Sequence, residues 1–185
     1  MEGSMILALL VLCTGLAAGS EEHAIKDFDF SKFAGLWYEI CFAMKAGAPA
    51  KDPEAEKIGG VVLQLENGSL ILTAAHYEDH CVVEKTTATK KVVPGTFTII
   101  REGGKGNKEV QVLSTDYKTY AVMDIHFMMD NVSHQVMKLY SRSLDHNEKA
   151  LEKFHEVAQE HGFKEPDFHL LKNDTACVTA LQGPV

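Results

Sequence analysis

The segment at positions 33–45 reads FAGLWYEICFAMK, and its interpretation decides the fold. It contains the chain's one tryptophan, Trp37, which follows a glycine by two residues, and a thiol at Cys41. A glycine allows another backbone or ring to approach closely, and a tryptophan buries a large apolar surface. The segment therefore predicts a strand in which Trp37 closes one end of a β structure. The alternative is an active site in which Glu39 and Cys41 carry out chemistry.

Eight short runs rich in apolar and β-branched residues occur along the chain, with turn residues between them. Asn67-Gly68 separates the second run from the third, and this dipeptide is typical of a tight hairpin. The pattern predicts an all-β fold, an eight-stranded antiparallel up-and-down barrel that leaves no sheet edge open. The expected strands span 35–44, 58–66, 69–77, 81–89, 96–102, 108–115, 119–128 and 134–142.

One amphipathic helix is expected after the strands, in the stretch LDHNEKALEKFHEVAQEHGF at 144–163. Asp145 with Glu148 predicts a capping box at its start, and Gly162 suits the left-handed position at its end. An amphipathic helix can bury its apolar face only against the outside of such a barrel. That face consists of Leu151, Phe154, Val157 and Ala158. The segment PDFHLLKND, at 166–174, is interpreted as a short strand or extended segment.

The N-terminus has the pattern of a secretory signal peptide. An apolar run at 5–17 is followed by the small residues Ala17, Ala18 and Gly19. The run is too short to span a bilayer comfortably. The sequence thus predicts a signal peptide at 1–19, cleaved after Ala18 or Gly19, and a single secreted domain at 20–185.

The charge of the chain limits its partners. The formal net charge is −8, and no basic stripe is present. Nucleic acids and anionic membrane surfaces require clustered positive charge, so neither is an expected partner, and membrane insertion is not expected. The nine histidines are scattered, and none is spaced for a metal site. No nucleophile–histidine–carboxylate set, phosphate-binding loop or dinucleotide fingerprint is found, so no cofactor is expected.

Cysteines and sequons agree with secretion. Once the signal peptide is removed, Cys41, Cys81 and Cys177 remain, which in an oxidising compartment suggests one disulfide and one free thiol. Three N-glycosylation sequons fall in expected turns or in the tail. They begin at Asn67, Asn131 and Asn173.

Three motifs in this order resemble the signature regions of the lipocalins. They are Gly35-Leu36-Trp37, Thr115-Asp116-Tyr117 and Arg142. With the single helix and the late cysteine, the resemblance covers 27–177. It implies a cup whose closed end is formed by Gly35, Trp37, Thr115, Asp116, Tyr117 and Arg142. In physical terms, Arg142 can stack its guanidinium on the indole of Trp37 while donating to backbone carbonyls.

The resemblance also implies a disulfide and a ligand. It implies that Cys81 pairs with Cys177, which leaves Cys41 as the odd thiol. Lipocalins carry small hydrophobic ligands, and the segment KDFDFSKFAGLWYEI at 26–40 is most similar to retinoid-binding members from the epididymis. A retinoid such as retinoic acid is therefore the expected ligand, and a fatty acid is a second possibility.

Strand alternation from Arg142 places one set of side chains inside the barrel. Lys138 is the exception in an otherwise apolar set, because a buried lysine needs water or an anion. A ligand carboxylate would supply that anion, with Arg101 as a second candidate anchor; otherwise Lys138 extends to the rim or lies outside. The expected ligand contacts are Val61, Leu63, Ile71, Thr73, Phe97, Ile99, Arg101, Val110, Val112, Met123, Ile125, Val136, Lys138 and Tyr140.

Two alternative functions remain at this point. The first is a lipocalin-type isomerase that uses Cys41. In the prostaglandin-isomerising lipocalins the thiol lies early in the second strand, where this chain has Ile58-Gly59-Gly60-Val61, and alternation from Trp37 places Cys41 near the barrel floor. The second is a carrier of fatty acids or odorants whose loops at 46–57 and 102–107 surround the mouth and bind a cell-surface receptor.

Overall fold

The computed structural model describes residues 25–47, 57–101, 103, 106–145 and 147–182. The expected signal peptide and most of the 46–57 loop lie outside these residues. Among the described residues, no helix has the length and apolar character needed to cross a membrane.

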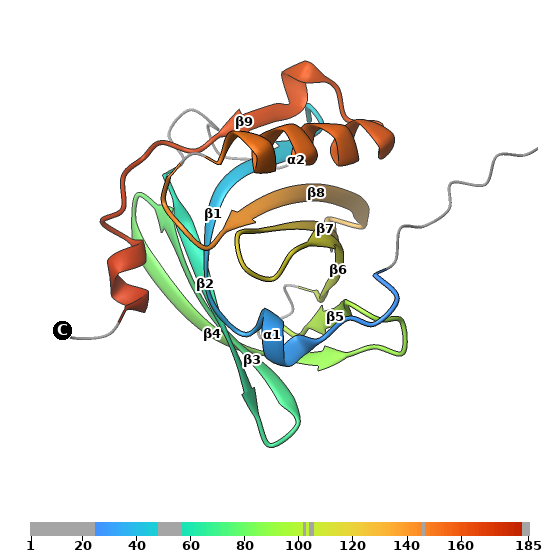
Figure 1. Ribbon diagram of the computed structural model, residues 1–185, viewed down its shortest axis with the longest axis vertical. Helices are drawn as coiled ribbons and strands as arrows, with labels where there is room; N and C mark the ends of the chain where they lie inside the picture. Colours follow the sequence, from blue (N-terminus) through green and yellow to red (C-terminus); the bar gives the residue numbers. More distant parts are fainter. Residues whose placement is uncertain (1–24, 48–56, 102, 104–105, 146, 183–185) are drawn as a thin grey trace, which may run out of the picture.

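The strands form a closed antiparallel barrel, which confirms the predicted fold (Figure 1). Neighbouring strands follow the order β2-β3-β4-β5-β6-β7-β8-β1, and a β1–β2 pairing closes the ring. A short strand, β9, pairs with β1 where β2 has ended. The bounds are β1 Gly35–Met44, β2 Gly59–Glu66, β3 Ser69–Glu78, β4 His80–Lys90, β5 Thr96–Ile99, β6 Lys108–Thr115, β7 Tyr120–Met129, β8 Val132–Ser141 and β9 Phe168–Leu170.

Tight hairpins set the strand register. Asn67 and Gly68, between β2 and β3, have φ of 49° and 84°. Asp130 and Asn131, between β7 and β8, have φ of 51° and 61°. Two consecutive left-handed residues produce the turn whose twist matches that of the flanking strands. These hairpins fix which residues face each other across each strand pair.

A short helix that the sequence analysis did not predict, α1 (Phe30–Phe33), lies at the closed end of the barrel (Figure 1). It begins at Asp29, whose carboxylate accepts hydrogen bonds from the backbone N–H groups of Ser31 and Lys32. Phe33 is buried, and its ring centroid lies 5.1 Å from that of Trp37. This helix therefore forms part of the barrel floor.

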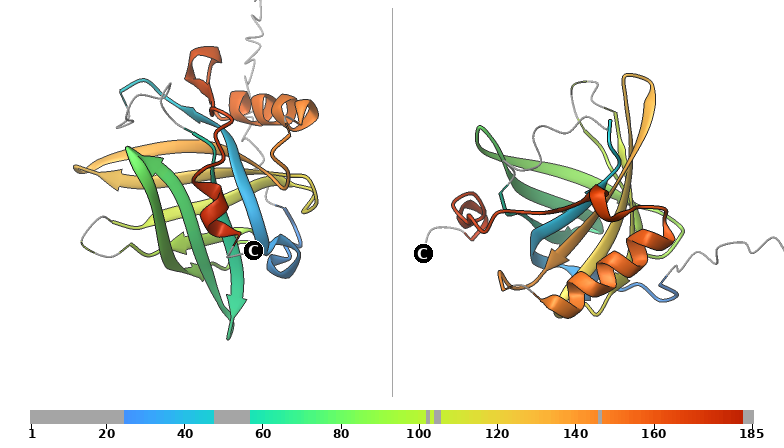
Figure 2. Two further views of the ribbon diagram at one scale, coloured as in Figure 1. Left: turned by 90° about the vertical axis from the view of Figure 1, so that its left-hand side faces the viewer. Right: turned by 90° about the horizontal axis from the view of Figure 1, so that it is seen from above.

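The predicted long helix is α2 (Glu148–Glu160), which lies outside the barrel against β7 and β8 (Figure 2). Its buried residues include Phe154, Val157 and Ala158, as predicted. The predicted capping box is wrong: the N-cap is Asn147, whose side chain accepts from the N–H of Ala150. Gly162 has φ of 83° just beyond the helix end, which confirms its predicted left-handed conformation. The 3₁₀ helices η2 (Glu165–Asp167) and η3 (Val178–Leu181) flank β9 and the tail.

A β-bulge interrupts β1 opposite β8. Glu39 pairs with Tyr140, whereas Cys41 pairs with Leu139, so one extra residue is inserted between Glu39 and Cys41. Because paired residues share a face, the bulge moves Cys41 to the face opposite Glu39. The predicted position of Cys41 beside Trp37, near the floor, is therefore wrong.

Candidate functional site

Strand pairing identifies the inner face of the barrel. Directly paired residues point the same way, so an inward position can be followed from strand to strand around the ring. One such circuit runs from Phe42 on β1 to Lys138 on β8 and Met123 on β7, and then to Val112 on β6. The register places these expected contacts on the inner face: Val61, Leu63, Phe97, Ile99, Val110, Val112, Met123, Ile125, Val136, Lys138 and Tyr140.

The expectation for β3 requires correction. Leu63, on the inner face of β2, pairs with Leu72, and Val61 pairs with Ala74. Ile71 and Thr73 therefore project from the opposite, outer face. The inward residues of β3 include Leu70, Leu72 and Ala74. The Asn67-Gly68 hairpin already contained this information, because a two-residue turn pairs Glu66 with Ser69 and hence Leu63 with Leu72.

The inward lysine of β8 has a protein partner. Lys138 Nζ lies 2.7 Å from Glu39 Oε1, and Tyr140 donates a hydrogen bond to Glu39 Oε2 over 3.2 Å. The Glu39 and Lys138 side chains are only 13% and 27% exposed. Burial and the Glu39 charge raise the pKa of Tyr140 well above its usual value, so its hydroxyl stays protonated and can donate. Glu39 thus supplies the anion that the sequence analysis assigned to a ligand.

A second inward cation, Lys108, was missed by the sequence analysis. It opens β6, pairs with Ile99 and Phe127, and its Nζ lies 5.9 Å from the Phe127 ring centroid. Among the described residues, no carboxylate oxygen lies within 4 Å of this ammonium group. The alternation that placed Val110 and Val112 inside also places Lys108 inside, so the signal was present in the sequence.

Several charges surround Lys108. Burial, followed by the positive charges of Lys138 and Arg101, lowers its pKa to about 8, while Glu39 and Glu84 act in the opposite direction. Arg101 lies beyond the end of β5, and its Nε donates to the carbonyl oxygen of Gly106 over 2.9 Å. Lys108, Lys138, Glu39 and Glu84 therefore form a polar cluster on the inner wall, and Arg101 adds a positive charge from just beyond the end of β5.

The cluster lies above the closed end. Lys108 is seven residues before Thr115 on β6, a separation of roughly 20 Å along an extended strand. Thr115 adjoins the floor, so Lys108 lies toward the opposite end, where β5 leads into the 102–107 loop. Lys138 and Glu39 lie between these two levels. The cluster thus extends from the middle of the barrel toward its mouth.

Arg142 and Trp37 form the floor. Arg142 Cζ lies 3.6 Å from the indole centroid, and its Nη1 donates to the carbonyl oxygen of Leu36 over 2.7 Å. Its Nη2 donates to the carbonyl oxygen of Ala34 over 2.9 Å. Trp37 is fully buried, and its Nε1 donates to the carbonyl oxygen of Phe33 over 2.8 Å. Gly35 has φ of 103°, and a side chain there would meet Arg142 Nη1. Each group at this end already has a structural partner.

The Thr115-Asp116-Tyr117 motif closes the turn between β6 and β7. Burial alone would raise the pKa of Asp116, but hydrogen bonds from the Thr119 hydroxyl and from three backbone N–H groups lower it below its usual value. Thr115 Oγ1 accepts from the N–H of Tyr117 over 2.9 Å. The Tyr117 hydroxyl in turn accepts from the N–H of Asp29 over 3.1 Å. The motif therefore joins the floor to the N-terminal segment.

The cysteines are arranged as the family resemblance implied. Cys81 and Cys177 form a disulfide that joins the start of β4 to the tail. Cys41 is a buried free thiol, and burial raises its pKa to about 12. A thiol with this pKa is almost entirely protonated at neutral pH and is a poor nucleophile. The described residues place no cation beside it that would activate it.

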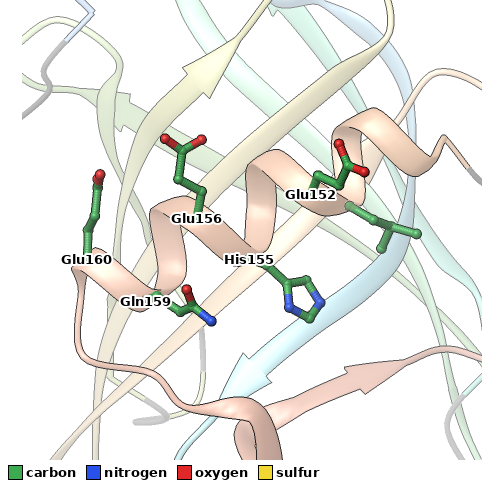
Figure 3. Close-up of a pocket in the computed structure, with 6 residues that line it drawn as sticks. Glu152, His155, Glu156, Gln159 and Glu160 are labelled. Atoms are coloured by element: carbon green, nitrogen blue, oxygen red, sulfur yellow. The ribbon is translucent and has the colours of Figure 1, made fainter.

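One surface pocket lies away from the barrel interior. It lies on the outer side of α2, where Glu152, His155, Glu156, Gln159 and Glu160 project from a single helix (Figure 3). His155 stacks on Phe168 with a centroid distance of 4.0 Å. A second pocket lies at the rim, between the end of β1 and the β7–β8 hairpin. Within the described ranges, no three His, Cys, Asp or Glu side chains are grouped to hold a metal ion.

The sequons and the mouth loops are partly described. Asn67, Asn131 and Asn173 are all exposed. Asn67 and Asn131 occupy hairpin turns. Of the 102–107 loop the structure describes residues 103, 106 and 107, so the expected receptor-binding surface lies largely outside the described residues.

Comparisons with known proteins agree with this architecture. Residues 34–172 match the lipocalin / cytosolic fatty-acid binding protein family. Epididymal-specific lipocalin-5 from Rattus norvegicus is 51% identical over 99% of this chain and 97% of its own length. The Mus musculus protein of the same name is 48% identical over 99% and 95%. A solved structure of the siderocalin Ex-FABP superposes with a TM-score of 0.69 at 26% identity, covering 78% of this chain and 97% of that one. The chain belongs to the lipocalin family, whose members are generally carriers of small hydrophobic ligands.

Proposed function

We propose that this protein is a secreted carrier that holds an acidic retinoid, such as retinoic acid, inside its barrel. The observation that supports this most directly is the cation Lys108, which faces inward among apolar residues with no carboxylate partner within 4 Å in the described structure. Burial of the polyene drives binding, at roughly 25 cal/mol per Å² before the costs of association. The expected apolar contacts on the inner face form the lining.

Lys108 replaces Lys138 as the proposed carboxylate anchor. Lys138 already pairs with Glu39, so a ligand acid at that depth would compete with a neighbouring carboxylate. Lys108 and Arg101 lie nearer the mouth, where their like charges disfavour each other and a carboxylate would relieve that repulsion. The proposed ligand therefore lies with its apolar end toward Trp37 and its acid group near Lys108.

The alternatives receive less support. The isomerase hypothesis needs a reactive thiol, and Cys41 is buried on the outer face of β1 with a raised pKa. None of the relatives named above has an enzyme name. The carboxylate of a fatty acid could bind Lys108 in the same way as that of retinoic acid, so a fatty-acid carrier is the second candidate function. Secretion through a signal peptide, and glycosylation of the exposed sequons, belong to this proposal as well.

Ligand extraction and titration would test the proposal. Organic extraction of the native secreted protein followed by mass spectrometry should recover a retinoid acid; recovery of fatty acids alone would favour the second candidate. In fluorescence titrations, Lys108→Met should weaken retinoic acid binding about tenfold, the loss expected for one charged hydrogen bond. Retinol affinity should be unchanged, and Lys118→Met, at an exposed lysine beyond the floor, should change neither. Equal loss for acid and alcohol would contradict the anchor role.

A further inference from the structure

We infer that the Lys108 side-chain amine captures apolar aldehydes inside the barrel as a reversible imine. The inference rests on the proposed function only in requiring that an apolar ligand enters the barrel. It adds a covalent activity to a protein otherwise expected to bind its ligand non-covalently. It also gives the half-buried lysine a role when its amine is neutral.

The position of Lys108 meets the requirements for imine formation. The amine must be accessible to a ligand carbonyl, must not be held by a carboxylate, and must lie in a setting that disfavours its charge. Lys108 is half-buried and lies on the inner face of the barrel, paired with Ile99 and Phe127. Among the described residues, no carboxylate oxygen lies within 4 Å of its Nζ. Lys138 fails the second requirement, since Glu39 lies 2.7 Å from its Nζ.

The electrostatic surroundings lower the basicity of Lys108. Burial and the cations of Lys138 and Arg101 bring its pKa to about 8. At pH 7.4, about a fifth of the Lys108 amines are then neutral, against about one in a thousand for an ordinary lysine. Desolvation and a neighbouring cation are the two recognised means by which proteins turn a lysine into a nucleophile.

The chemistry balances without any further reagent. The neutral amine attacks the aldehyde carbon, a C–N bond forms, and the carbonyl oxygen takes up a proton to give a carbinolamine. The hydroxyl then leaves as water, the nitrogen having lost both of its hydrogens, and a C=N bond remains. Hydrolysis reverses the sequence and releases the aldehyde. Glu39 and Glu84, whose charges act on Lys108, would stabilise the protonated imine.

Reductive trapping tests the inference. The secreted protein is incubated with all-trans-retinal at pH 7.4, reduced with cyanoborohydride, digested and mapped by mass spectrometry. The expected result is an adduct at Lys108 in at least about tenfold higher yield than at any exposed lysine, as its larger neutral fraction requires. Excess retinoic acid should block the adduct. Its rate of formation should level off above about pH 8, whereas labelling of exposed lysines should continue to rise.

Two Lys→Arg variants test whether the amine of Lys108 forms the adduct. Lys108→Arg removes the amine that would form the imine, so it should lose the adduct. Lys118→Arg, at an exposed position, should keep both the adduct and retinoic acid binding. Thermal unfolding monitored by circular dichroism establishes that each variant is folded.

The possible failures are distinguishable. An adduct that persists in Lys108→Arg, or labelling spread evenly over exposed lysines, would overturn the inference. Retinal that quenches Trp37 fluorescence without forming an adduct would overturn it as well and leave the proposed carrier function intact. If neither retinal nor retinoic acid binds, both are overturned.

Discussion

Replacement of Lys138 by methionine tests whether Glu39 is its functional partner. Methionine retains most of the side-chain volume and removes the charge, so Glu39 would keep only the Tyr140 hydrogen bond. Removing one member of a fully buried ion pair costs about 3–5 kcal/mol, because the other charge is left uncompensated. The Glu39 and Lys138 side chains retain 13% and 27% exposure, so water moderates the loss. We therefore expect the free energy of unfolding to fall by about 2–3 kcal/mol at pH 7.

Urea unfolding at equilibrium, followed by tryptophan fluorescence, would measure this change. A matched control is Lys153→Met on α2, where Lys153 and Glu156 form a surface pair at 3.0 Å with 41% and 60% exposure. That substitution should change stability by less than about 0.5 kcal/mol. The double variant Glu39→Gln/Lys138→Met should recover most of the loss, since no charge is then left unpaired.

Two results would contradict a stabilising Glu39–Lys138 ion pair. One is a loss for Lys138→Met no larger than that of the Lys153 control. The other is a stable Lys138→Met protein whose retinoic acid affinity falls tenfold or more, which would identify Lys138 as a ligand anchor.

Four other predictions concern the floor, the cysteines and the mouth. Trp37→Ala should cost about 3–5 kcal/mol of unfolding free energy, since a fully buried ring is removed; less than about 1 kcal/mol in urea titrations would contradict its role in the floor. Cys81→Ser should lower stability by about 2–5 kcal/mol, because it opens a loop between cysteines 96 residues apart; unchanged unfolding would argue against the chain-entropy account. Cys41 should react with iodoacetamide only on unfolding, because its pKa is raised to about 12; rapid labelling of the folded protein would contradict its burial. Retinoic acid affinity should be highest well below pH 8 and fall as pH rises through about 8, where Lys108 loses its proton, while Lys108→Arg should show no such fall.

The fold was predictable because its signals are local. Alternating apolar runs, the Asn67-Gly68 turn and the 3.6-residue spacing in α2 each depend on neighbours in the chain. The strand bounds accordingly agree closely, apart from β5, which ends at Ile99 rather than at position 102. The short helix α1 escaped prediction because its four residues carry no helical periodicity and are stabilised by the floor.

The site was less predictable because it depends on register and on long-range pairing. The error at Ile71 and Thr73 was avoidable, since the hairpin fixes the β2–β3 register. The bulge after Glu39 was not, because nothing in the local pattern announces the inserted residue. The Glu39–Lys138 pair joins residues far apart in the chain, so the sequence showed a buried cation but not the carboxylate that balances it.

Along one edge, the strand that pairs with β1 changes from β2 to β9, and this change has a consequence for association between molecules. On one edge β1 pairs with β2 as far as Glu39, and then with β9 from Cys41 to Ala43. Without β9, that part of β1 would present unpaired backbone groups, and an exposed edge of this kind is a template for a strand from another molecule. The tail after α2 therefore covers the part of the β1 edge that β2 leaves open, and the Cys81–Cys177 disulfide ties this tail to the start of β4.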